Sequence, residues 1–357
     1  MSRPPNPLKY PRRPIGPAES SEGGAKAPSL RTLPRLRQSG PVTMRLGYAC
    51  VNTQLPSSAR TVRLANATPE RLLELAEANL DALEAILRWN DEHGIQVFRV
   101  TSNLIPLASH PVNTVAWWEE LEGRFGELAE LVARAGARLS THPGQYTVLS
   151  SPRQPVVAAS VAELDYHDRL LSALGLDRSH KIVLHVGSGA ADPETAAARF
   201  AAGFGRLSQG AQSRLVLEND ERWPLDRILA LAAQLGTPVV FDAFHHELAP
   251  TAEELGVRDA VLAAAETWRP EDGRQEVHFS TQQPGKRPGA HAETLDLAAF
   301  EAFAEAVGDL PLDCVLEVKD KEQSVLRARE RLSRSRTRRQ TVPPAAARAA
   351  RPGARRR

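Results

Sequence analysis

The chain has 357 residues, of which 42% are hydrophobic, and a net charge of +2. This length accommodates one large α/β barrel or two ordinary domains. No apolar run is long enough to span a membrane, and the first residues lack the apolar stretch of a secretion signal, so we expect a cytoplasmic protein. The two cysteines, Cys50 and Cys314, are far apart, which excludes a disulfide framework or a zinc ribbon and fits a reducing cytosol.

The charge is distributed unevenly along the chain. Residues 1–43 carry eight Lys/Arg and two Glu, and residues 331–357 carry ten Arg and no acid, so the remaining body is strongly acidic. We therefore predict a disordered, basic, proline-rich extension over 1–43, one barrel domain over 44–330, and a disordered Arg-rich tail over 331–357. The two ends either bind nucleic acid by counterion release or act only as solubilising segments. Met44 directly precedes the first predicted strand, and translation from this methionine would omit the extension.

From Arg45 onward, strand-like apolar runs alternate with segments of helical periodicity. Strands are predicted at 45–51, 96–101, 138–142, 181–186, 214–218, 238–242, 275–280 and 313–317. Helices are predicted near 68–92, 117–135, 156–174, 193–207, 225–235, 251–268, 296–307 and 321–332. Eight equal β/α repeats favour a closed TIM (β/α)8 barrel over an open doubly wound sheet.

Metal-binding side chains end, or closely follow, seven of the predicted strands. In chain order they are His110, His142, His185, Glu218, Asp242, His278 and Glu317. Because the carboxyl ends of barrel strands converge on one rim, we expect these side chains to meet in one pocket. Three more histidines follow in the loops: His245, His246 and His291. Strand alternation places Glu276 on the same face as His278.

This composition of side chains predicts a cluster of divalent ions. Buried carboxylates need partners, and the sequence offers few cations near these positions. Imidazole and carboxylate ligands without thiolate suit Mn²⁺, Zn²⁺ or Fe²⁺, and there are too many ligands for one ion, so we expect two or three ions. Such clusters activate water and hold the oxygens of a phosphoester. Each residue alone has an ordinary structural explanation, whereas the joint pattern favours a metal site.

Several long motifs in this barrel region resemble those of a known protein family. They are RLGYACVNTQ, ARTVRLAN, NLDALEAILRWNDEHGIQVFRVTSNLIPLASH, STHPGQY, IVLHVG, LVLEND, VVFDAFHHE, VHFST, GAHAETLD and LEVKDKE. The chain resembles the UV damage endonuclease family, the UvdE-type repair nucleases, over about 45–330. The resemblance implies an endonuclease IV-like TIM barrel with divalent ions, most often Mn²⁺, with Zn, Fe, Co or Mg also possible. It also implies hydrolysis of the phosphodiester immediately 5′ to a damaged nucleotide, leaving a 3′-hydroxyl.

The resemblance also assigns residues. It implies metal ligands at His110, His142, His185, Glu218, Asp242, His245, His278, His291 and Glu317, and lesion-probing side chains at Gln145 and Tyr146. A Gln-Tyr pair on a loop is suited to wedging into a duplex with weakened stacking. By the same resemblance, Tyr48 and Asn52 are expected to line the groove that binds DNA. Candidate phosphate contacts are Lys286, Arg287, Lys319 and Lys321, for which a solvated surface role is equally compatible with the sequence.

One position departs from the family pattern. The family commonly has a lysine, described as carboxylated, two residues before the strand-seven histidine, and this position is Glu276 here. We hypothesise that Glu276 replaces the carbamate as an anionic oxygen ligand, together with the catalytic carboxylates Glu218, Asp242 and Glu317. The resemblance further implies damaged double-stranded DNA and downstream excision-repair enzymes as partners, a nucleoid-associated location, and a monomer.

Other functions fit parts of the pattern. An abasic-site endonuclease or a metal-dependent sugar isomerase shares this fold, and fold alone does not separate them. An isomerase has little use for the Gln145-Tyr146 pair or for basic ends. A non-catalytic DNA-damage sensor would keep the barrel without a working site, and Glu276 is the one feature that supports it.

Overall fold

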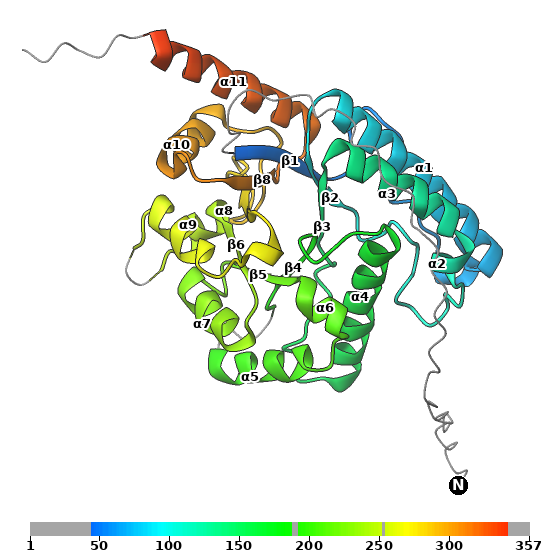
Figure 1. Cartoon of the computed structure of the whole chain (residues 1–357). Helices are drawn as coiled ribbons and strands as arrows, with labels where there is room; N and C mark the ends of the chain where they lie inside the picture. The colour runs from blue at the N-terminus through cyan, green and yellow to red at the C-terminus, as the bar shows by residue number, and fades with distance from the viewer. Residues whose placement is uncertain (1–43, 188–191, 252–253, 342–357) are drawn as a thin grey trace, which may run out of the picture. The chain divides into compact units, whose positions relative to one another are not determined.

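Eight parallel strands form a closed barrel, as the sequence predicts (Figure 1). The computed structural model describes residues 44–187, 192–251 and 254–341, with side chains up to residue 334. The predicted extension at 1–43 and the residues after 341 lie outside the described part of the chain. The strands are β1 (Met44–Cys50), β2 (Val97–Val100), β3 (Arg138–Thr141), β4 (Lys181–His185), β5 (Leu215–Glu218), β6 (Val239–Asp242), β7 (Gln275–Phe279) and β8 (Leu312–Leu316).

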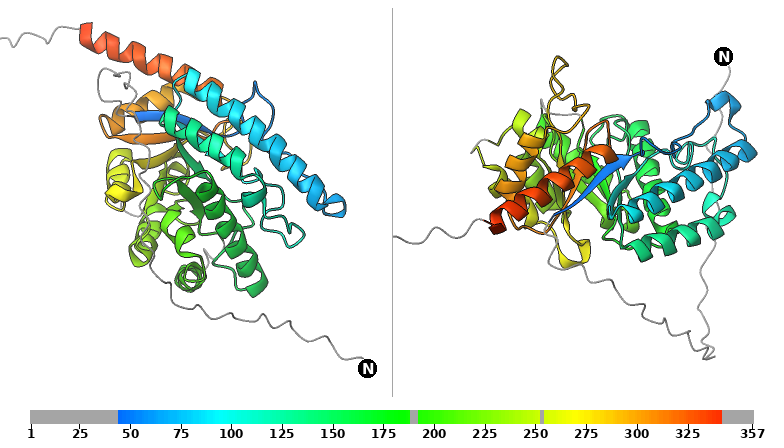
Figure 2. Two further views of the ribbon diagram at one scale, coloured as in Figure 1. Left: turned by 45° about the vertical axis from the view of Figure 1, so that its right-hand side comes forward. Right: turned by 90° about the horizontal axis from the view of Figure 1, so that it is seen from above.

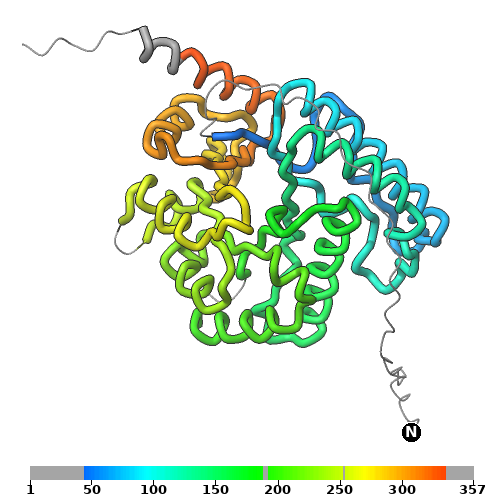
Figure 3. Tube along the Cα trace, in the orientation of Figure 1, coloured from blue at the N-terminus to red at the C-terminus, as the bar shows by residue number. Residues whose placement is uncertain are grey.

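Each strand pairs with its neighbour in the sequence, and β8 closes the barrel on β1 with Met44 opposite Leu312. The chain therefore runs once around the barrel in order, which Figure 3 shows as a progression of colour from blue to red. The connecting helices are α1 (Pro69–Glu92), α2 (Trp117–Glu120), α3 (Glu122–Ala135), α4 (Gln154–Ala173), α5 (Pro193–Phe204), α6 (Gln209–Arg214), α7 (Leu225–Leu235), α8 (Ala243–Leu248), α9 (Val257–Ala265), α10 (Leu297–Val307) and α11 (Glu322–Thr341).

Helix boundaries differ from the prediction in several places. The helix predicted over 117–135 is interrupted at Leu121, two short helices (α6 and α8) were not predicted, and α9 is shorter than the predicted 251–268. Helix α11 continues to Thr341, beyond the helix end predicted at residue 332. α11 packs against α10 and β1, and the turned views in Figure 2 show its course along the barrel. Among the described helices, none combines the length and apolarity needed to cross a membrane.

Helix α1 begins as its sequence predicts. The hydroxyl of Thr68 accepts a hydrogen bond from the backbone N–H of Arg71, and Pro69 occupies the first helical position, where its missing N–H costs nothing. The helix ends at His93, and the following Gly94 has a positive φ of 64°. This 24-residue helix lies beside α3, and the two helices cover the same side of the barrel (Figure 2).

Branched side chains fill the barrel interior below the rim. One layer contains Ala49, Val97 and Val315, and another contains Val183, Val216 and Val240. Because side chains alternate along a strand, the residues two positions after Val216, Val240 and Val315 face the same interior. Those residues are Glu218, Asp242 and Glu317, so the fillers below position the carboxylates above.

Ion pairs close the opposite, N-terminal end of the barrel, which we call the barrel floor. Asp313 is fully buried and contacts three guanidinium groups, those of Arg45, Arg138 and Arg274. Lys181, also fully buried, lies 2.6 Å from a carboxylate oxygen of Asp272. These pairs join strands that are distant in sequence, which is a structural role expected of the N-terminal face of a TIM barrel.

His180, at the start of β4, should make folding sensitive to acid. Its Nδ1 accepts a hydrogen bond from the backbone N–H of Leu139 at 3.0 Å, and burial lowers its pKa from 6.5 to about 4. Between these values the unfolded chain binds a proton that the folded chain does not, so stability falls as the pH decreases from 6.5 to about 4. The full effect is about 3 kcal/mol.

We therefore expect urea denaturation to show a smaller loss of stability over this pH range for His180→Asn, whose amide oxygen can accept the same hydrogen bond. Parallel pH profiles for the wild type and the variant would contradict this assignment.

Candidate metal centre

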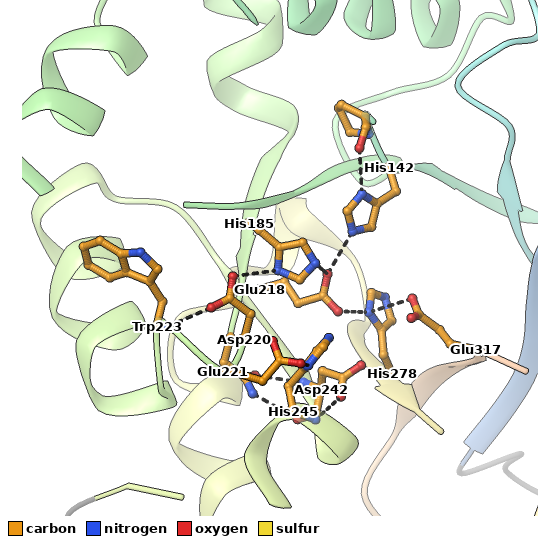
Figure 4. A network of polar contacts seen from close by, with 12 residues as sticks. His142, His185, Glu218, Asp220, Glu221, Trp223, Asp242, His245, His278 and Glu317 are labelled. Carbon is orange, nitrogen blue, oxygen red and sulfur yellow. Dashed lines mark hydrogen bonds and ion pairs between the residues drawn. The ribbon is translucent and has the colours of Figure 1, made fainter. Parts of the chain in front are cut away.

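Histidines and carboxylates from successive strand ends converge at the C-terminal rim of the barrel (Figure 4). Two groups have potential ligand atoms within 4.8 Å of one another. The first group contains His142, His185 and Glu218, and the second contains Glu218, Asp242, His278 and Glu317. The ligands come from residues 142 to 317, and they meet because the carboxyl ends of parallel barrel strands converge on one rim.

Glu218 belongs to both groups and joins them. One of its carboxylate oxygens lies 3.1 Å from His142 Nε2 and 3.4 Å from His185 Nε2. The other oxygen lies 2.5 Å from His278 Nδ1. Only 1% of Glu218 is exposed, so both oxygens are directed to the interior of the cluster. A carboxylate held between two sets of nitrogen and oxygen donors has the geometry of a ligand shared by two neighbouring ions.

His245 and His291 extend the cluster, as predicted. The ring of His245 lies 5.6 Å from that of His185 and 5.9 Å from that of His291, measured between centroids. His291 Nδ1 lies 3.5 Å from a carboxylate oxygen of Glu317 and 2.9 Å from the Glu317 carbonyl oxygen. Eight of the nine predicted ligands therefore belong to one connected network.

His110 is the exception. It lies ten residues after the end of β2, in a loop, so the prediction that it marks a strand end is wrong. Its imidazole is exposed, and its Nδ1 accepts a hydrogen bond from the backbone N–H of Val112. Among the described residues it belongs to neither of the two groups. His246 is also separate, because its Nε2 contacts the carbonyl oxygen of Leu255.

Arg99 is a member of the site that the sequence prediction missed. It is 5% exposed in β2, forms an ion pair with Glu317, and places Nη2 2.5 Å from His278 Nε2. The sequence was expected to offer few cationic partners for these carboxylates, and Arg99 is one such partner, for Glu317. The sequence did carry a signal for this position, because Arg99 is a charged residue inside the apolar run at 96–101. Strand alternation directs Arg99 to the same barrel interior as Val97.

Asp220 and Glu221 were missed as well. They follow β5, and each approaches one histidine: Asp220 Oδ2 lies 3.6 Å from His185 Nδ1, and Glu221 Oε1 lies 3.4 Å from His245 Nδ1. Carboxylates behind the second ring nitrogen of a ligand histidine fix its orientation and raise its basicity. The loop after β5 therefore positions two histidines that come from different strands (Figure 4).

Burial and charge shift the pKa values of these groups in opposite directions. Burial alone would raise the pKa of Glu218, but His278, His185 and His142 outweigh it and hold this pKa well below its usual value. At Asp242, by contrast, burial dominates, and it raises the pKa together with the negative charges of Glu218 and Glu317.

The histidine at the centre of the cluster responds to the same carboxylates. Burial would lower the pKa of His278, but Glu218 and Glu276 raise it to about 10. His278, which would serve as a ligand, thus holds a proton that metal binding would displace.

The available donor atoms fit divalent ions. Asp242 Oδ2 is buried and has no hydrogen-bond partner among the described residues. A buried polar atom without a partner costs free energy, so this oxygen needs a ligand. Nitrogen and oxygen donors without thiolate are the ligands preferred by Mn²⁺, Fe²⁺ and Zn²⁺. The residues present therefore suit ions of this kind.

Glu276 lies deeper in the barrel than the shared carboxylate. It is 1% exposed, accepts a hydrogen bond from the Ser140 hydroxyl at 3.1 Å, and lies 3.1 Å from His278 Nε2. The predicted orientation toward the site is confirmed by the contact with His278. Glu276 is not a member of either close group of potential ligands.

The predicted lesion-probing pair lies on the rim. Gln145 and Tyr146 are exposed in the loop after β3, and Tyr146 is 84% exposed, which is unusual for a large aromatic side chain. Gln145 lines a cavity of about 680 Å³ together with His142, His185 and Arg287. The cavity thus connects the predicted lesion-probing loop to the metal-ligand cluster.

Two other predicted DNA contacts are not at the surface. Tyr48 is fully buried and Asn52 is 2% exposed. The Tyr48 hydroxyl donates to Asn90 in α1 and accepts from the Asn52 amide, and its ring packs on Phe98. The prediction that they line the DNA groove is therefore not supported, because strand alternation turns Tyr48 outward against α1.

The predicted phosphate contacts differ in availability. Lys286 and Arg287 are exposed in the loop after β7. Lys319 forms an ion pair with Glu293, so its charge is already partly neutralised. Lys321 is half-buried and has a positive φ of 50°.

The fold and this cluster define a β/α-barrel protein with a histidine- and carboxylate-rich centre at the C-terminal rim. The sequence model of the family described as UV-endonuclease UvdE matches residues 44–346, and the chain belongs to this family. The match covers the whole described barrel.

Individual relatives agree with this assignment. A UV DNA damage endonuclease of Clostridium perfringens is 35% identical over 289 residues, covering 80% of this chain and 69% of the relative. A UV-damage endonuclease of Schizosaccharomyces pombe is 32% identical and covers 79% of this chain, but the match spans only 49% of that longer protein. The crystal structure of SacUVDE superposes with a TM-score of 0.77 at 37% identity, covering 82% of this chain and 99% of that one.

Proposed function

We propose that this protein is a UV DNA damage endonuclease that uses divalent ions to hydrolyse the phosphodiester immediately 5′ to a damaged nucleotide. The shared position of Glu218 between two groups of ligand atoms is the observation that carries the proposal. The family membership and the names of the relatives support a nuclease that acts on UV-damaged DNA.

The proposed ligands are the eight connected residues of the cluster, with His110 retained only on family resemblance. Two or three ions would be bound, most often Mn²⁺, and when bound they would activate water and stabilise the negative charge of the phosphoester. Asp242, Glu218 and Glu317 hold their carboxylates at the rim, and Arg99 fixes Glu317 by its ion pair. Asp220 and Glu221 orient His185 and His245.

Two further roles follow for the chain's own residues. Glu276 is proposed as the anionic group that replaces the carboxylated lysine of the family, acting beside His278 rather than within the close ligand groups. Gln145 and Tyr146 are proposed to enter the duplex at the lesion, where weakened stacking lowers the cost of insertion. Readout would then depend on DNA shape and deformability rather than on sequence.

A nicking assay tests the proposal. Supercoiled plasmid, irradiated or untreated, is incubated with the full chain in Mn²⁺ or in EDTA. We expect nicking of irradiated plasmid only, and only with the metal ion. Equal nicking of both plasmids, or nicking in EDTA, would contradict the proposal.

The products distinguish related functions. Mapping on an oligonucleotide with one photoproduct should place the cut immediately 5′ to the lesion and leave a 3′-hydroxyl. Efficient cutting of abasic DNA without cutting of the photoproduct would indicate an abasic-site endonuclease. Binding of irradiated DNA without cutting would indicate a damage sensor.

A further inference from the structure

Unpaired cationic side chains are concentrated in loops at the C-terminal rim. Among residues with described side chains, several arginines and lysines in these loops make no side-chain hydrogen bond, ion pair or ring contact. They are Arg63, Arg153, Arg222, Lys286, Arg287 and Lys321. By contrast, the arginines of the barrel floor and most of those on the outer helices have acidic or carbonyl partners.

Two of these cations, Arg222 and Arg287, lie together. Both line the cavity of about 680 Å³ that also contacts His142 and His185. Arg222 follows β5 and Arg287 follows β7, and the two loops touch, because a Cβ atom on Gly289 would lie 2.5 Å from Glu221 Oε1. The two guanidinium groups are therefore brought to one cavity by loops from different strands.

The acidic neighbours of Arg222 are engaged elsewhere. Asp220 approaches His185 and accepts two backbone hydrogen bonds, and Glu221 approaches His245. Neither carboxylate forms an ion pair with Arg222. The loop therefore leaves the charge of Arg222 available while its carboxylates position histidines.

We propose that Arg222 and Arg287 form a two-arginine clamp that binds DNA backbone phosphates in this cavity, beside the metal-ligand cluster. This inference rests on the proposed function and adds Arg222, which the sequence had not indicated, to Arg287. The planar guanidinium group matches two phosphate oxygens at once, and no existing ion pair has to be broken for it to do so. The clamp holds the strand on the side of the cluster where His142 and His185 lie.

The test compares Arg222→Gln and Arg287→Gln with Arg227→Gln in the full chain. Arg227 is a matched control, because it is also exposed and unpaired but lies on α7, away from the rim loops. The affinity for a fluorescent duplex is measured by anisotropy over a range of KCl concentrations. Each clamp variant should bind about fivefold more weakly, and its salt slope should decrease by about one, whereas Arg227→Gln should match the wild type.

Nicking kinetics give a second measurement. The clamp variants should raise KM with little change in kcat, because a backbone contact binds substrate and transition state alike. Arg222→Lys should recover part of the affinity, since the charge is retained. Affinity, salt slope and KM equal to those of Arg227→Gln would overturn the clamp.

The outcome separates the clamp from the proposed function. If the wild type nicks irradiated plasmid but Arg222→Gln and Arg287→Gln behave as Arg227→Gln does, the clamp is wrong and the endonuclease remains. If the wild type binds duplex without nicking, the endonuclease is wrong, and the salt slopes still decide the clamp. A wild type that binds no DNA overturns both.

Discussion

Glu218→Gln should reduce nicking of irradiated DNA by about a thousandfold, because it removes the charge of the one carboxylate shared by the two ligand groups. The amide keeps the shape of the side chain but binds divalent ions weakly, so the variant should also bind fewer ions per chain. Nicking rates, together with metal content measured by mass spectrometry after dialysis, check both expectations.

A matched substitution excludes a general effect of losing one carboxylate. Glu77→Gln changes an exposed glutamate on α1 and should leave metal content and nicking unchanged. Glu218→Gln that retains the full ion load and nicks within about threefold of the wild type would show that Glu218 is not a shared ligand.

The residues that meet at the strand ends could be predicted from the sequence, because barrel geometry determines where they lie. Parallel strands in a barrel converge at one rim, and alternation fixes which side chains face the interior. Glu218, Asp242 and His278 follow from these two facts, and the layer of Val216 and Val240 below them confirms the alternation. The same rule applied to Val97 would have identified Arg99.

Residues beyond the strand ends were less predictable. A loop residue has no fixed periodicity, so spacing alone did not show that His110 is exposed while Glu221 approaches His245. Tyr48 shows the opposite error, because it lies within β1, where alternation turns it toward Asn90 on α1. Family resemblance implied roles for His110 and Tyr48, whereas the exposure of these side chains depends on packing between elements.

The second large effect is expected on stability, from a substitution in the barrel floor. Asp313→Asn should lower the free energy of unfolding by about 3–5 kcal/mol, because the buried carboxylate of Asp313 is the common partner of Arg45, Arg138 and Arg274. Its oxygens lie 2.6 to 3.1 Å from the three guanidinium groups. The amide removes the negative charge without changing the volume, so guanidinium groups remain close together without their counter-charge. Urea denaturation at pH 7 measures the loss.

Two further variants identify charge as the cause. Asp309→Asn makes the same chemical change at a side chain that is 91% exposed, and it should alter stability by no more than about 0.5 kcal/mol. Adding Arg274→Gln to Asp313→Asn removes one of the uncompensated cations and should recover part of the lost stability, since neighbouring charges couple. If the double variant is less stable than Asp313→Asn by the full cost of Arg274→Gln alone, the two residues act independently, and repulsion among the arginines is not what destabilises the floor.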